Sequence, residues 1–355
     1  MSGDISFLKR LLAEPGPSGF ESRAARVWRE EATTFAEVWS DVVGSSYAAV
    51  RRDSRPLVLL AGHIDEIGLQ VTHIHKSGLL YFAGIGGWDP QVLVGQRVKV
   101  LGAKGDVPGV IGRRAIHLIK PKDRSKAAEV GKLWIDVGAE SRDDVGELGV
   151  RVGDPAVLDA GFLPLAGDRV AGRALDNRVG AFVVLEALRI AASAEGKAGV
   201  VAVATAQEEI GYTGGGARAS AFGLSPDVAL VVDVTHATDV PDVDKREVGE
   251  HELGGGPVLT RGSATSPVVF ELLAETAEAH EIPYTIQAAP RRTGTDADSI
   301  HLAREGVPTG LVSIPNRYMH SPSEMVATGD LFRTAELLAA LCARLGDGDV
   351  DLTRR

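Results

Sequence analysis

The 355-residue chain has a single cysteine, Cys342, and therefore cannot form an internal disulfide. One thiol inside the apolar run LLAALCARL is typical of a buried core residue and is compatible with a reducing compartment. No stretch approaches the roughly 18 uninterrupted apolar residues that a membrane span requires. Asp4, Lys9 and Arg10 interrupt the apolar start too early for a signal peptide. We therefore expect a mature cytoplasmic protein without a membrane partner.

Basic charge is also scarce, because 38 lysines and arginines stand against 48 acidic residues and the formal net charge is −10. Proteins that bind nucleic acid usually present a basic patch or stripe, so the composition argues against a nucleic-acid partner. The chain has no GxSxG segment, and neither HELGG at His251 nor HEIPY at His280 completes the HExxH motif. These absences argue against a serine-hydrolase elbow and against a helical HExxH zinc site.

Apolar residues are plentiful at 44%, which is enough for the core of one large domain or of two. Apolar runs of strand length alternate with helical periodicity, and this alternation favours a mostly parallel α/β sheet. The expected helices span residues 7–14, 22–32, 178–194, 267–280 and 330–345, and the expected strands span residues 56–65, 200–206, 227–234 and 309–314.

Between residues 69 and 164 helical periodicity is nearly absent, and closely spaced turn residues indicate short antiparallel strands. We therefore expect an α/β fold with a mostly parallel central sheet flanked by helices and an inserted, β-barrel-like domain. The catalytic domain would be discontinuous, comprising residues 1–68 and 165–355, and the insertion would comprise residues 69–164.

Metal-compatible side chains follow the expected strands at the points where the apolar runs end. Because open α/β sheets bind ligands beyond the carboxyl ends of their strands, we expect these side chains to converge in one crevice. One further aspartate comes just before the expected helix at residues 178–194. The full set comprises His63, Asp65, Glu208, Glu209, Asp233, His320 and Asp176.

Two imidazoles and three carboxylates from this set form the mixed nitrogen and oxygen ligand set that Zn²⁺ accepts, and Co²⁺ or Mn²⁺ could also fit. A shared aspartate can give one oxygen to each of two ions, so five residues can hold a pair of ions roughly 3.5 to 4 Å apart. Such a pair lowers the pKa of a bridging water and polarises a carbonyl oxygen. We therefore predict two divalent ions per subunit, with zinc as the first choice.

An attacking water also needs a base that is not itself bound to metal. Adjacent glutamates beyond a strand point in different directions, so we assign Glu208 as the general base and Glu209 as a ligand. Asp65 lies two residues after His63 and, in extended backbone, could accept the second ring N–H of that histidine and fix its tautomer. The sequence thus predicts a hydrolase in which Glu208 and Asp65 support the chemistry.

Five segments occur in an order and spacing that resemble the tetrahedral (TET) aminopeptidases, the glutamyl-aminopeptidase-like dinuclear metallopeptidases: AGHIDEIG, GRALDNRVG, ATAQEEIGYTGG, VVDVT and NRYMHSPSEM. The resemblance covers nearly the whole chain, including the β-rich insertion. It implies a zinc-exopeptidase-like fold and a zinc- or cobalt-dependent exopeptidase that trims short peptides from the amino end.

The resemblance also implies a role for each candidate. In the family pattern, one imidazole and one carboxylate hold each ion and a further aspartate bridges the two. Carried onto this chain, these residues are His63 with Asp233, His320 with Glu209, and the bridging Asp176, with Glu208 as general base and Asp65 behind the first histidine.

Three further expectations come from the same resemblance. Gly62 stands where the family more often has alanine, and Thr295 and Asp296 are candidates for the substrate pocket. Because the family builds dodecameric tetrahedral shells through its insertion, residues 69–164 are expected to form an oligomerisation domain. The protein is then a homo-oligomer, either a dimer or a dodecamer.

The residues by themselves leave other interpretations open. A histidine after a strand is often structural, and Asp176 could simply cap the following helix. The same ligand set would also serve a dinuclear carboxypeptidase or an amide deacylase, which would differ in the terminus that the substrate must present. A metal-independent glycosidase would use Glu208 and Glu209 alone. A shell-forming protein without catalytic activity would hold its ions for structure only.

Overall fold

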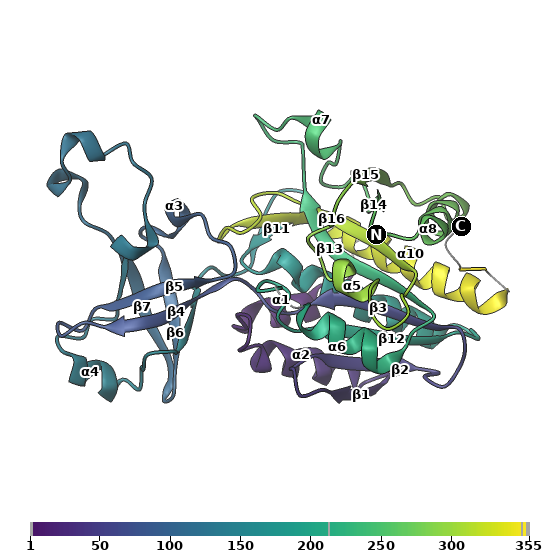
Figure 1. The fold of residues 1–355 in the computed structure, drawn as a ribbon, viewed down its shortest axis with the longest axis horizontal. Coiled ribbons are helices and arrows are strands. Elements are labelled where there is room, and N and C mark those ends of the chain that lie inside the picture. Colours follow the sequence, from purple (N-terminus) through teal and green to yellow (C-terminus); the bar gives the residue numbers. More distant parts are fainter. Residues whose placement is uncertain (1–2, 212–213, 349–350, 353–355) are drawn as a thin grey trace.

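An eight-stranded sheet lies at the centre of the larger of two parts of the molecule (Figure 1). The computed structural model describes residues 3–211, 214–348 and 351–352. The strands are, in spatial order, β1 (Glu37–Ser40), β2 (Ser46–Val50), β12 (Gly199–Thr205), β3 (Leu57–His63), β13 (Val228–His236), β16 (Thr309–Asn316), β14 (Val258–Gly262) and β15 (Thr285–Ala289). The four central strands, β12, β3, β13 and β16, are parallel, as predicted. Antiparallel pairing occurs towards the edges, between β1 and β2, β2 and β12, and β16 and β14.

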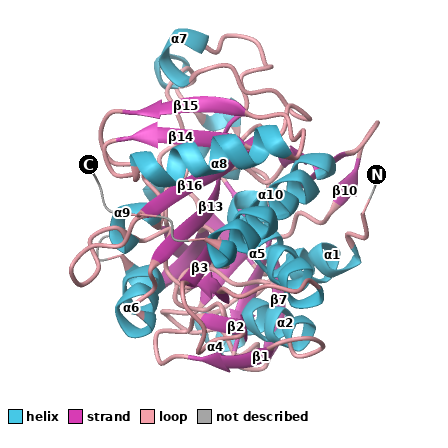
Figure 2. Cartoon of the chain, turned by 90° about the vertical axis from the view of Figure 1, so that its right-hand side faces the viewer, coloured by secondary structure: helices cyan, strands magenta, loops and turns pink. Residues whose placement is uncertain are grey.

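Helices cover both faces of this sheet. One face carries α1 (Ser6–Ala13), α2 (Ser22–Ala32), α5 (Leu175–Ser193), α8 (Pro267–Ala279) and α10 (Thr328–Asp347), and the other carries α6 (Gly215–Leu224) and α9 (Ala297–Ile300). Figure 2 shows α5, α8 and α10 lying across the sheet. Strand β12 contributes to both cores, since Val200 and Ala202 pack on the α5 side and Val201 and Val203 on the α6 side. Burial on both faces explains why the central strands are continuous apolar runs.

Helix α5 packs unusually close to β3. A methyl group on Gly62 would lie 2.6 Å from the backbone carbonyl carbon of Gly180, so the glycine allows the helix and the strand to touch. This close approach brings the first turn of α5, which contains Asp176, to the end of β3, which contains His63. The absence of a side chain at position 62 is therefore a packing requirement of this helix–strand contact.

The second part of the molecule is a closed barrel that projects from the body (Figure 1). Its strands are, in spatial order, β4 (Gly68–Ile74), β5 (Leu80–Ile85), β8 (Trp134–Asp136), β7 (Gly105–Gly112), β6 (Arg97–Gly102) and β9 (Pro155–Leu158). Short helices α3 (Pro90–Leu93) and α4 (Arg142–Glu147) and three 3₁₀ turns, Ile116–Leu118, Pro121–Asp123 and Val130–Lys132, lie in the connections. All six strands come from one continuous stretch of the chain, and whether that stretch is an oligomerisation domain stays a prediction.

The remaining elements lie between or beside these two parts. A small antiparallel sheet consists of β10 (Leu163–Pro164), β11 (Arg169–Gly172) and β17 (Glu324–Ala327), and the short helix α7 (Lys245–Val248) follows β13. The expected helices and strands all occur, and the elements that the sequence does not predict include β1, β2, β14, β15 and α6. Among the described residues, no helix is both long enough and apolar enough to span a membrane.

A buried ion cluster ties the chain's beginning to the central sheet. The Glu66 carboxylate, 2% exposed, accepts hydrogen bonds from Nη2 of Arg178 at 2.8 Å, from Nη1 of Arg173 and from the Gly16 amide at 2.9 Å. The Arg178 side chain is fully buried. Removing one member of such a cluster leaves an uncompensated charge away from water. The cluster therefore fixes the segment that follows α1 against β3 and α5.

We expect Glu66→Ala to lower the free energy of unfolding by about 3–5 kcal/mol, because the Arg178 guanidinium would remain buried without its carboxylate. Equilibrium urea unfolding measures the change. The matched control is Glu37→Ala, which breaks the exposed Arg52–Glu37 pair and should change stability by about 0–1 kcal/mol. Equal losses in the two variants would contradict the role given to the cluster.

Candidate functional site

The structure brings all seven predicted site residues together beside the ends of β3 and β12. His63 is the last residue of β3, and the two glutamates lie in the loop that follows β12. Asp233 lies within β13, Asp176 lies in the first turn of α5, and His320 lies in the loop between β16 and β17. The segment after the glutamates includes residues 212 and 213 of the ATAQEEIGYTGG motif, which fall outside the described residues.

Two placements differ from the sequence expectation. Asp233 does not end its strand, because β13 continues to His236. His320 is not carried by a strand, because β16 ends at Asn316 and three residues separate that end from the histidine. His320 also has a positive φ of 58°, in the left-handed region that non-glycine residues seldom adopt. The direction of this imidazole is therefore set by an irregular loop backbone and not by the alternating side-chain directions of a strand.

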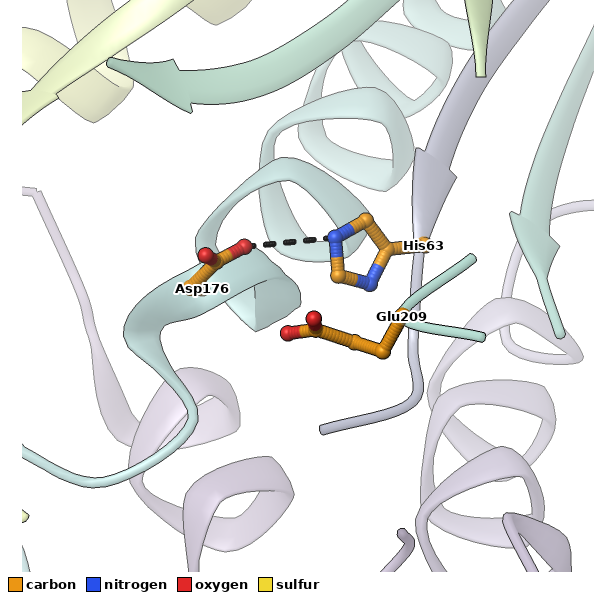
Figure 3. A group of neighbouring side chains, drawn as sticks. All are labelled: His63, Asp176 and Glu209. Carbon is orange, nitrogen blue, oxygen red and sulfur yellow. Dashed lines mark ion pairs between the residues drawn. The ribbon is translucent and has the colours of Figure 1, made fainter. Parts of the chain in front are cut away.

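Asp176 faces both histidines at once. Its Oδ1 lies 3.2 Å from Nε2 of His63, and its Oδ2 lies 3.2 Å from Nε2 of His320. Figure 3 shows the first of these contacts, with the carboxylate of Glu209 directed towards the same space. One carboxylate that offers a separate oxygen to each of two imidazoles has the arrangement that a bridging ligand requires.

Each imidazole has a second carboxylate beside it. Nε2 of His63 lies 3.8 Å from Oδ1 of Asp233, whereas Nε2 of His320 lies 3.3 Å from Oε2 of Glu209. One ligand atom from each of His63, Asp176 and Glu209 lies within 4.8 Å of the other two. The side chains therefore form one cluster around Asp176, in which Glu209 lies near both histidines.

Asp65 joins the base of the site to the loop that holds the two glutamates. Its carboxylate accepts the backbone amides of Glu208 and Glu209, both at 3.1 Å, and the hydroxyl of Ser18. Nδ1 of His63 lies 3.2 Å from the backbone carbonyl oxygen of Asp65 and 3.4 Å from its Oδ1. Asp65 therefore orients the first histidine, as the spacing predicts, although the closer acceptor is its carbonyl oxygen.

Burial and crowding shift the ionisation of the site. Burial raises the pKa of Glu208 to about 10, and it raises the pKa of Asp233 well above its ordinary value. Burial and the nearby Asp176 carboxylate raise the pKa of Glu209 to about 7. Burial also acts to raise the pKa of Asp176, but hydrogen bonds with the two imidazoles outweigh it and lower that pKa well below the usual value. Asp176 and Glu209 in turn raise the pKa of His320 to about 11.

The donor set fits divalent cations. Oε1 of Glu209 is buried and has no hydrogen-bond partner among the described residues, which is a costly state for a carboxylate oxygen. The raised pKa values of Glu208, Glu209 and Asp233 show the same imbalance, because burial and neighbouring acids raise them more than the nearby histidines lower them. A bound cation would replace the protons that such a cluster otherwise retains.

Residues outside the predicted set also shape the site. Glu324 is 2% exposed and accepts the backbone amides of both Asp176 and His320. It belongs to the quoted NRYMHSPSEM segment, but no local pattern marks it. Asp296, a predicted pocket candidate, is 4% exposed and accepts a hydrogen bond from the Thr205 hydroxyl, and a contact with substrate stays a prediction. Burial raises the pKa of Asp296 to about 6.

The barrel reaches the same site through the loop after β5. A methyl group on Gly87 would lie 3.5 Å from Nδ1 of His320, and one on Gly86 would lie 3.4 Å from the carbonyl oxygen of Glu209. Gly86 also has a φ of +74°, which favours glycine. These glycines thus allow the backbone of the loop to approach the site closely.

A helix-flanked parallel sheet, an inserted barrel and carboxylates that converge with imidazoles beyond the strands define a class of metal-dependent peptidases. Residues 44–337 match the family described as M42 glutamyl aminopeptidase, and the chain belongs to this family. Over 348 residues it is 36% identical to a lysyl aminopeptidase from Pyrococcus furiosus, with 96% of this chain and 97% of that protein covered. The protein is thus a peptidase, as predicted.

Solved structures agree with this assignment. The TET aminopeptidase of a marine sediment Thaumarchaeota archaeon superposes with a TM-score of 0.91 at 36% identity, covering 97% of this chain and 96% of that one. The TET1 peptidase of Pyrococcus horikoshii, which is described as assembling into a tetrahedron or a large octahedral shell, gives 0.84 at 31% identity, covering 95% and 98%. The predicted fold class is confirmed.

We expect Asp65→Asn to lower the free energy of unfolding of the metal-free protein by about 1–3 kcal/mol, because the new amide NH₂ would face backbone N–H donors. Chemical denaturation in the presence of a chelator measures this loss. Ser18→Ala removes one donor to the same carboxylate and should cost about 1 kcal/mol or less. An Asp65→Asn variant with an unchanged free energy of unfolding would show that this side chain does not stabilise the loop.

Proposed function

We propose that this protein is a metal-dependent aminopeptidase that removes the N-terminal residue from short peptides with the help of two divalent ions. The observation that carries the proposal is the position of Asp176, whose two oxygens each lie 3.2 Å from a different imidazole. His63 and Asp233 would hold one ion, and His320 and Glu209 would hold the other. Zinc is the first choice for this donor set, and cobalt or manganese would also be accepted.

Two such ions, when bound, supply a water of lowered pKa and polarise the scissile carbonyl. Glu208 is then the residue best placed to move protons. Its carboxylate lies 3.7 Å from Nε2 of His63, and its side chain is 16% exposed, so a water molecule in the site can reach the carboxylate. Its backbone amide is held by Asp65, which leaves the side chain unrestrained by that contact. Glu208 takes a proton from the attacking water and returns it to the leaving amine.

The competing interpretations make different use of the same residues. A glycosidase would employ two carboxylates without metal, yet Glu208 lies beside His63 and Glu209 beside His320, and a metal-free mechanism leaves both imidazoles without a role. A carboxypeptidase or amide deacylase would use the same ligands. The similarity to a lysyl aminopeptidase supports the aminopeptidase interpretation. The preferred N-terminal residue depends on the walls of the substrate pocket and not on the metal ligands.

We further propose that residues 69–164 form an oligomerisation domain and that the protein is a homo-oligomer. The assembly described for the TET1 peptidase of Pyrococcus horikoshii supports a shell, with a tetrahedral dodecamer as the expected form. A cytoplasmic location is part of the same proposal, since the one thiol, Cys342, is buried and needs no partner.

Removal of metal should abolish hydrolysis of aminoacyl-anilides, and Zn²⁺, Co²⁺ or Mn²⁺ should restore it. Glu208→Gln should bind the same number of ions as the unaltered protein but lower kcat by about 10²–10⁴-fold, because the base is lost while the ligands remain. Elemental analysis and steady-state kinetics provide the two measurements. Glu30→Gln, which changes an exposed glutamate of α2, is the control. Unimpaired turnover in Glu208→Gln, or activity that resists chelation, would contradict the mechanism.

An aminopeptidase should also require a free amino terminus. We expect acetylation of the N-terminus of a short peptide to eliminate cleavage, whereas amidation of its carboxyl terminus should leave kcat/KM nearly unchanged. Mass spectrometry of the products identifies the bond that is cut. The reverse pattern would identify a carboxypeptidase, and cleavage of the acetyl group itself would identify a deacylase.

A further inference from the structure

A single buried carboxylate connects two of the backbone segments that carry candidate ligands. Glu324, the first residue of β17, directs Oε2 to the amide of Asp176 and Oε1 to the amide of His320, both at 2.9 Å. The first partner lies 148 residues away in the sequence and the second lies four residues away. The side chain therefore joins the start of α5 to the loop between β16 and β17.

Neither segment is held by regular secondary structure at that point. Asp176 lies in the first turn of α5 but has non-helical angles, φ −78° and ψ 107°, and Ala174 before it has a φ of 60°. His320 has a φ of 58°, and Tyr318 has a φ of 60°. The left-handed angles of Ala174, Tyr318 and His320 persist only where their surroundings hold them. The Glu324 carboxylate supplies one strong hydrogen bond to each segment.

The two candidate metal-binding histidines are supported differently. His63 is at the end of a central strand, its side chain is 2% exposed, and Asp65 holds its Nδ1. The side chain of His320 is 34% exposed, and no hydrogen-bond partner of its Nδ1 is found among the described residues. Apart from the contacts of its Nε2 with Asp176 and Glu209, the orientation of His320 depends on its backbone, and hence on the carboxylate that accepts its amide.

We propose that Glu324 is a positioning residue that sets the geometry of the ion held by His320 and Glu209, while the ion held by His63 and Asp233 depends on it much less. This inference rests on the proposed function, because it assigns a residue to one half of the proposed dinuclear centre. Asp176 belongs to both halves, but its contact with His63 is also fixed by the close packing of α5 on β3.

The test is a titration of metal-free Glu324→Ala with Zn²⁺, followed by calorimetry and by elemental analysis. We expect one of the two sites to lose affinity by about 10–100-fold, as is usual when a residue that orients ligands is removed, while the other changes by less than about threefold. Glu324→Gln should behave similarly, because its NH₂ group would face one of the two amides. If the alanine variant does not fold, the glutamine variant gives the same comparison.

Asp330 offers a matched control in the neighbouring helix, α10. This fully buried carboxylate accepts the amides of Gly254 and Gly256 at 2.8 and 2.9 Å and a hydrogen bond from Arg333 at 3.2 Å, but touches no candidate ligand. Asp330→Asn therefore disrupts a two-amide contact of the same kind away from the site. It should lower the unfolding temperature in the manner of Glu324→Gln and leave both Zn²⁺ affinities unchanged.

A second readout needs no metal. In the metal-free protein, hydrogen exchange at the amides of Asp176 and His320 should quicken in Glu324→Gln and stay unchanged in Asp330→Asn. The proposal is overturned if both Zn²⁺ affinities of the Glu324 variants stay within about threefold of the unaltered protein, or if both sites weaken equally. An unaltered protein that binds fewer than two ions would instead refute the proposed dinuclear centre, and with it this inference.

Discussion

The accumulation of negative charge away from water is the constraint on which the rest of the structure depends. Asp176, Glu209 and Asp233 each lie within 3.8 Å of His63 or His320, whose imidazoles oppose their charge. Carboxylates so confined repel one another and resist ionisation unless cations or protons accompany them. A fold that tolerates this arrangement must anchor each group from a different direction, which is what the strands, α5 and the irregular loops do.

The side chains that hold the ligand-bearing segments in place are themselves buried and polar. Glu66 holds two arginines beneath the end of β3, Asp65 holds the loop that follows β12, and Glu324 holds the start of α5 and the loop before β17. Each carboxylate accepts several hydrogen bonds, so its burial is compensated. Chain segments that are distant in sequence are thus tied at one edge of the sheet by acids that do not themselves face the proposed ions.

Part of this arrangement could be predicted from the sequence. The central strands are continuous apolar runs that end near His63 and Glu208, so both the parallel sheet and the converging ligands were apparent. The edge strands β1 and β15 could not be predicted, because exposed and half-buried positions interrupt their apolar pattern. Asp233 within its strand and Glu324 beneath the site depend on register and on contacts between distant segments, which local periodicity does not encode.

The approach of Gly86 and Gly87 to Glu209 and His320 means that the barrel and the central sheet both contribute backbone to the surroundings of the site. A displacement of the barrel would therefore also move the loop after β5, which lies beside His320, the more exposed of the two imidazoles. If residues 69–164 mediate the proposed subunit contacts, a neighbouring subunit that binds the barrel would also act on the backbone beside Glu209 and His320.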